Sequence, residues 1–211
     1  HYCPNYLHCP PQITGRIIHF AGRKAMNIDG LGDETIDLLY RSRLIRNVAD
    51  LYDLTADQLS VLERMGEKSA RNIIESIKAT SEIPYQKVLF ALGIRHVGET
   101  VAATIAKGFP DIDSLMTASE EELTRLPEIG PRIAASIREY FSDNDNIEII
   151  NRLRERGIRF RGAVKAVSGG LLEGQKIVIS GTFTRHSREE YKEIIENNGG
   201  INASSVSSGV T

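Results

Sequence analysis

The sequence predicts a mainly α protein made of one unit repeated four times: a helix, a tight glycine hairpin and a second helix. Three observations predict this fold. An apolar-x-x-apolar-Gly pattern recurs four times at nearly constant spacing, helical periodicity follows the copies, and capping signals start new helices between them.

The four copies of the pattern read IDGLG, LERMG, IRHVG and LPEIG, and they end at Gly32, Gly66, Gly98 and Gly130. The copies are therefore 34, 32 and 32 residues apart. A single copy occurs by chance in many proteins, whereas four at regular spacing indicate an internal repeat. We call residues 28–32, 62–66, 94–98 and 126–130 the first to fourth hairpins.

Helices are expected on both sides of each hairpin. After the second hairpin, Ala70, Ile73 and Ile77 recur on one helical face, and similar patterns follow the third and fourth hairpins. Residues 55–58 and 119–122 match the capping box, a sequence signature of a helix N-terminus. The unit is thus helix, hairpin, helix throughout.

The hairpins are candidate phosphate-binding sites. Glycine tolerates positive φ and allows a ligand to approach the backbone closely, and the helix that follows begins with unpaired amides at the positive end of its dipole. Both features suit an anion such as phosphate. The candidate DNA-binding residues are Gly30, Gly32, Arg64, Gly66, Lys68, Arg95, His96, Gly98, Thr100, Gly130 and Arg132.

A purely structural role for some hairpins stays open, because the same pattern also suits a tight interhelical turn. Asp33 and Glu34 follow the first hairpin and would repel phosphate, and Glu128 lies in the fourth. At least one hairpin is therefore a candidate interhelical turn without a ligand.

Composition limits the alternatives. The formal net charge of −2 does not indicate nucleic-acid binding, so such binding must rest on local features such as backbone amides. No apolar run approaches the roughly 18 residues of a membrane helix, and we expect no membrane partner. The only two cysteines, Cys3 and Cys9, indicate a reducing compartment. Because the chain starts at His1 inside a cysteine motif, we expect it to be part of a longer protein.

The phrases LFALGIRHVGETVA, CPNYLHCPPQ and NIDGLGDETIDLL, together with the tandem hairpins, resemble bacterial NAD-dependent DNA ligases over essentially the whole chain. The resemblance implies four segments. Residues 1–20 would be the second half of a four-cysteine zinc finger, residues 21–160 a helix-hairpin-helix domain, residues 161–172 a linker and residues 173–211 the first half of a BRCT domain.

The family's properties imply the ligands. Cys3 and Cys9 match the second pair of zinc-binding cysteines and would form half a zinc site here. Nicked duplex DNA would be the partner of a monomer, in the bacterial cytoplasm at the nucleoid. NAD and magnesium would bind to the parent enzyme outside this chain, where a lysine takes AMP from NAD and passes it to the 5′-phosphate of a nick.

The residues themselves contain no catalytic motif, such as Lys-x-Asp-Gly, a phosphate-binding G-x-x-x-x-G-K or a dinucleotide fingerprint. We therefore expect no catalytic or cofactor-binding residue in this chain, which should be inactive alone. The alternative is a DNA-binding scaffold, free-standing or part of a repair nuclease.

The C-terminal part has a different pattern. Residues 161–170 are rich in small residues, as in a linker. Residues 176–180 predict a short buried strand, residues 181–183 a turn, and a capping box at residues 187–190 a helix that Asn198-Gly199-Gly200 ends.

Overall fold

The structure is a computed structural model that describes residues 9–63, 65–162, 171–172, 175–181, 183, 191–192, 194–195 and 198–203. The chain divides into two compact units, residues 1–162 and residues 163–211. Helices make up most of the first unit, and the second contains a small parallel sheet. The predicted mainly α fold is confirmed.

The first unit consists of short helices joined by tight turns. Their bounds are α1 Pro10–Ala21, α2 Asp33–Arg41, η1 Val48–Asp53, α3 Ala56–Ser60, α4 Glu67–Ala79, η2 Thr80–Glu82, α5 Tyr85–Ala91, α6 Glu99–Gly108, α7 Ile112–Thr117, α8 Glu120–Thr124, α9 Pro131–Ser142 and α10 Asn144–Glu155. None of the helices within the described ranges is long and apolar enough to cross a bilayer.

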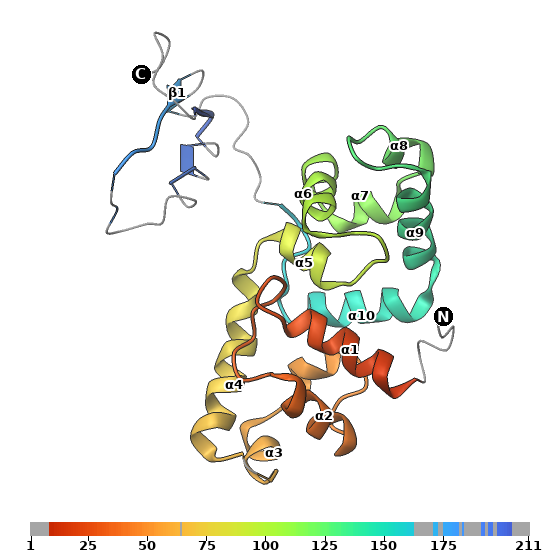
Figure 1. Ribbon diagram of the computed structural model, residues 1–211, viewed down its shortest axis with the longest axis vertical. Coiled ribbons are helices and arrows are strands. Elements are labelled where there is room, and N and C mark those ends of the chain that lie inside the picture. The colour runs from red at the N-terminus through yellow and green to blue at the C-terminus, as the bar shows by residue number, and fades with distance from the viewer. Residues whose placement is uncertain are drawn as a thin grey trace. The chain divides into compact units, whose positions relative to one another are not determined.

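The four helix-hairpin-helix units are present as expected. Each hairpin joins two helices that pack on each other: α1 and α2, α3 and α4, α5 and α6, and α8 and α9. We call α1 to α4 with the first two hairpins the first hairpin pair, and α5 to α9 with the last two the second hairpin pair. Figure 1 shows α10 between these two groups of helices, and it packs on both α9 and η1.

The expected helix starts are confirmed by their hydrogen bonds. At α3, the Thr55 hydroxyl accepts from the amide of Gln58, whose side chain accepts from the Thr55 amide in return. Ser119 and Glu122 make the same reciprocal contacts at α8. These caps satisfy amides that would otherwise lack partners at the first turn.

The apolar faces meet in one continuous core. Ile17 and Phe20 of α1 and Ile36 of α2 are fully buried, as are Ile105 of α6 and Ile137 of α9. The expected boundary between residues 20 and 21 falls inside α1, whose buried face belongs to this core. We therefore count the whole of α1 with the helical domain.

The second unit contains β1 Lys176–Ile177 and β2 Ile201–Asn202, which pair in parallel. The expected strand at residues 176–180 is thus shorter than the sequence suggested, and it is not buried, because its residues are exposed or half-buried. Gly199 has a φ of +83° in the turn before β2, as a helix-ending glycine should. The expected capping box at residues 187–190 lies outside the described residues.

Candidate nucleic-acid interface

The shared glycines occupy the same place in all four hairpins. Gly32, Gly66, Gly98 and Gly130 are the N-caps of α2, α4, α6 and α9, with φ between −88° and −78°. Any residue can adopt this extended backbone, so conformation does not require glycine here. The positive φ that glycine would permit does not occur at these four positions.

Packing within the protein does not require these glycines either. A Cβ added to any of the four would meet no described atom within 4 Å. Elsewhere in the unit, glycine does relieve a close contact: a Cβ on Gly108 would lie 2.5 Å from Leu126. The open space beside the shared glycines is therefore available to a ligand that approaches the backbone.

The amides that follow these glycines lack side-chain caps. In the described part of the chain, no side chain accepts a hydrogen bond from the first turn of α2, α4, α6 or α9. In contrast, α3, α7, α8 and α10 each begin with a capping side chain. The helices α1 and α5, which do not follow a hairpin, also begin without a side-chain cap. All four helices that follow a hairpin are uncapped, and their free amides and helix dipoles favour an anion.

Positive φ occurs two residues before the shared glycine. It is +83° at Gly30, +65° at His96 and +67° at Glu128. The equivalent residue of the second hairpin, the candidate Arg64, lies outside the described residues. Non-glycine residues adopt this conformation rarely, and they do so often at binding sites, where the surrounding structure holds them in place.

The third and fourth hairpins lie side by side. Arg132, at the second position of α9, donates from Nε to Nε2 of His96 over 3.2 Å. Partial desolvation and the positive charges of Arg132 and Arg95 lower the pKa of His96 below its ordinary value of 6.5. His96 is therefore neutral near pH 7. Three exposed candidate residues of the sequence analysis, Arg95, His96 and Arg132, meet at one surface.

Three of the four hairpin helices, α2, α4 and α6, begin with a carboxylate, which would repel a phosphate unless a cation offsets it. At α4, Glu67 pairs with Arg71 over 2.7 Å, and at α6, Glu99 pairs with Lys24 over 2.7 Å. Each cation offsets a carboxylate that would repel an anion at the helix start. At α9 the first residue is Pro131, which brings no charge.

The sequence analysis missed Lys24. It lies in the turn after α1, 75 residues before its partner Glu99, and nothing in the local sequence connects the two. The ion pair also raises the pKa of Lys24, through its hydrogen bond with Glu99 and the opposite charge. The third hairpin thus has a basic side chain from a distant turn in addition to Arg95.

The second residue of the helix that follows each hairpin also affects how well that hairpin could bind phosphate. It is Arg132 in the fourth, Lys68 in the second, Thr100 in the third and Glu34 in the first, and all four are exposed. Two of these are cations and one is a hydroxyl donor, all of which suit phosphate. The first hairpin alone offers a carboxylate.

The first hairpin has features of a structural turn. Among the described residues, neither Asp33 nor Glu34 forms an ion pair, so two carboxylates remain at the start of α2. A Cβ on Gly30 would lie 2.7 Å from Ile73 of α4, and the amide of Asp29 donates to Ser76 over 2.7 Å. This turn therefore packs against α4 of the same hairpin pair.

Only one of the two cysteines of the expected zinc half-site lies within the described residues. Cys9 is the half-buried N-cap of α1, whereas Cys3 lies outside the described residues. The described residues contain no group of three or more His, Cys, Asp or Glu side chains that could hold a metal ion. Their donor set does not fit a zinc site, and zinc binding through Cys3 and Cys9 stays a prediction.

Comparison with known protein families agrees with this arrangement. A family model described as a SAM-like helix-hairpin-helix tandem matches residues 23–79, and a helix-hairpin-helix motif model matches residues 87–150. Residues 167–211 match the BRCA1 C Terminus (BRCT) domain. The protein is therefore of the helix-hairpin-helix class, with a BRCT segment after the hairpins.

Full-length relatives narrow this class. The chain is 54% identical to a DNA ligase of Bacteroides fragilis over 99% of the chain and 32% of that protein. It is 53% identical to a DNA ligase of Phocaeicola vulgatus over 99% of the chain and 32% of that protein, and 49% identical to one of Cytophaga hutchinsonii over 100% and 31%. The chain belongs to the bacterial DNA ligase family and spans about a third of the length of these relatives.

Proposed function

We propose that this chain is the DNA-clamping region of an NAD-dependent DNA ligase that seals nicks in duplex DNA during replication and repair. It binds the DNA backbone without sequence specificity and is inactive by itself. The observation that carries the proposal is the open, uncapped helix N-terminus behind a glycine, repeated at the second, third and fourth hairpins.

Backbone amides explain how a chain with a net charge of −2 can hold DNA. The second, third and fourth hairpins each offer amide donors and a helix dipole to one phosphate, and nearby cations such as Lys68, Arg95 and Arg132 add charge locally. Phosphate contacts carry no sequence information, as a ligase requires because nicks occur in any sequence. The first hairpin serves mainly as a structural turn.

The chemistry of ligation would take place on the rest of the enzyme. NAD would supply AMP to a lysine there, magnesium would assist phosphoryl transfer, and neither binds to this chain. The hairpins would grip the duplex beside the nick so that the two DNA ends stay aligned. The relatives favour this assignment over a nuclease scaffold, since the three described above are named DNA ligases.

Titration of the 211-residue chain with nicked and intact duplexes of unrelated sequence tests the proposal. Because each phosphate contact contributes a slope of about 0.9 to the dependence of log affinity on log salt, three hairpins should give a slope of about 3. A matched variant carries Asp at Gly66, Gly98 and Gly130 and should lose most of this slope. Strong sequence preference, or an affinity that does not change with salt, would contradict the proposal.

A further inference from the structure

The most basic segment near the end of the first unit is RLRERGIRFR, residues 152–161. A cluster of arginines in a DNA-binding protein is commonly a phosphate-binding surface. In this structure, four of its five arginines instead form ion pairs with carboxylates on other elements. The pairs are Arg152 with Asp50 and Asp53, Arg154 with Asp113, Arg156 with Asp53, and Arg159 with Glu82.

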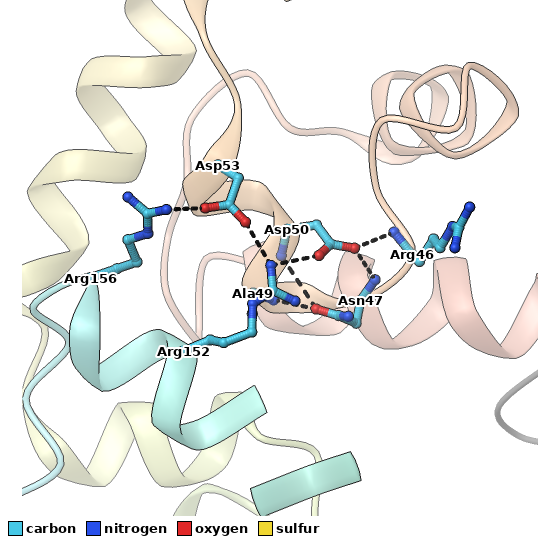
Figure 2. A network of polar contacts seen from close by, with 7 residues as sticks. All are labelled: Arg46, Asn47, Ala49, Asp50, Asp53, Arg152 and Arg156. Atoms are coloured by element: carbon cyan, nitrogen blue, oxygen red, sulfur yellow. Dashed lines mark hydrogen bonds and ion pairs between the residues drawn. The ribbon is translucent and has the colours of Figure 1, made fainter. Parts of the chain in front are cut away.

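Arg152 is the centre of the network (Figure 2). Its Nη2 lies 2.8 Å from Oδ1 of Asp50 and 2.6 Å from Oδ2 of Asp53, and its side chain is only 31% exposed. The other oxygen of Asp50 accepts from the amides of Arg46 and Asn47, 2.7 Å and 3.0 Å away. Asp50 is thus held in place by the cap of η1, and it gives Arg152 a fixed anchor.

The same segment is tied to the second hairpin pair through its backbone. The amide of Ile112 donates to the carbonyl of Phe160 over 2.9 Å, and the amide of Gly162 donates to the carbonyl of Pro110 over 2.8 Å. Arg154 adds an ion pair with Asp113 of α7. Residues 152–162 therefore contact η1 and η2 on one side and the start of α7 on the other.

We propose that residues 152–162 form a brace that holds the two hairpin pairs at the orientation in which both grip one duplex, with Arg152 as its main positioning residue. This inference rests on the DNA binding proposed above. The phosphates of a duplex have fixed positions, and two linked modules gain affinity over one only if both can engage at once. A fixed angle between the pairs supplies that condition.

The test compares Arg152→Met with the unchanged 211-residue chain on two blunt duplexes, of about 8 and about 24 base pairs. The short duplex is less than one helical turn of about 10 base pairs and should accommodate one hairpin pair, whereas the long one accommodates both. We expect the variant to bind the long duplex about tenfold more weakly. Its second hairpin pair is no longer held where it can engage the same duplex, so the gain from bivalent binding is lost. Affinity for the short duplex should not change.

Three variants serve as controls. Arg41→Met removes a cation from a surface pair with Asp37 on α2 and should change neither affinity. Arg152→Lys should restore the long-duplex affinity in part, because a lysine keeps the positive charge but is a more flexible point charge without the planar donor fork of arginine. Asp53→Asn leaves the cap of η1 intact, and it repeats the test if Arg152→Met does not fold.

The outcomes separate the brace from its alternatives. Equal weakening on both duplexes, with a salt slope lower by about 0.9, would show that Arg152 binds phosphate directly and would overturn the brace. An unchanged long-duplex affinity in a folded variant would overturn it as well. If the unchanged chain binds neither duplex, the proposed function fails instead.

The brace can be tested without DNA by spin labels at two exposed sites, Val61→Cys and Glu121→Cys, with Cys3 and Cys9 replaced by Ser. These labels report on the second and fourth hairpins. The brace is supported if the distribution of distances between the two labels is narrow in the otherwise unchanged chain and broadens with Arg152→Met. An unchanged distribution would refute it.

Discussion

Replacing Gly98 by Asp should stabilise the fold and at the same time weaken DNA binding. Gly98 has an extended backbone with φ of −84°, so aspartate fits without strain, and its Cβ would meet no described atom within 4 Å. Asp is a better N-cap than Gly, a carboxylate interacts favourably with the helix dipole, and the loss of glycine restricts the unfolded chain. Together these effects should raise the free energy of unfolding by about 1 kcal/mol.

The same carboxylate would occupy the amides that the phosphate needs. The lost hydrogen bonds to a charged phosphate are worth about 1.5–3 kcal/mol, which corresponds to a roughly tenfold to hundredfold lower affinity. The salt slope should fall by about 0.9. Urea unfolding measures the first effect, and fluorescence anisotropy of labelled duplex at several salt concentrations measures the second.

Gly32→Asp is the matched control, because Gly32 has the same extended backbone, open space and N-cap position in the hairpin that we consider structural. It should stabilise the fold similarly and leave DNA affinity unchanged. In the full-length ligase that we propose, Gly98→Asp should still allow the lysine-AMP adduct to form from NAD but should prevent nick sealing. Normal sealing by a folded variant would mean that the third hairpin is only an interhelical turn.

Four further predictions follow from particular contacts. Gly30→Ala should lower the free energy of unfolding by roughly 2–4 kcal/mol, because a φ of +83° and a Cβ 2.7 Å from a buried isoleucine both oppose alanine; urea unfolding measures it. Lys24→Met should weaken duplex binding severalfold, and the effect should shrink in the Glu99→Gln background, where no carboxylate is left to offset. DNA affinity should rise as the pH falls from about 7.5 to about 5.5. A bound phosphate would offset the positive charges of Arg132 and Arg95, which lower the pKa of His96, and would therefore raise this pKa. DNA binding would then be coupled to proton uptake by His96. Metal analysis should find little zinc in this chain and stoichiometric zinc in a longer one that includes a further cysteine pair.

Each of these predictions has a result that would contradict it. A Gly30→Ala variant as stable as the unchanged chain would show that the first turn does not need glycine. Equal effects of Lys24→Met in both backgrounds would assign Lys24 a direct phosphate contact instead. A proton uptake that persists in His96→Asn would come from another group, and stoichiometric zinc in the short chain would require other ligands.

The repeated unit could be predicted from the sequence because its determinants are local. A glycine, two apolar residues and a capping box act within a few residues of one another, so their spacing predicts a helix, a hairpin and a helix directly. The same locality let the sequence identify Gly66, Gly98 and Gly130 as candidates. The position of the positive φ could not be predicted, because closing the turn places it at His96 rather than at the glycine.

The charges around the hairpins depended on tertiary structure. Lys24 pairs with Glu99 across 75 residues, and Arg152 with Asp50 across 102. Side chains that far apart in the sequence meet only after the helices have packed, and a pattern of single residues carries no signal of which pair will form. The sequence by itself therefore determined the four hairpins. Packing decided which carboxylates are neutralised and which arginines are held in ion pairs, because ion pairing depends on distances in space.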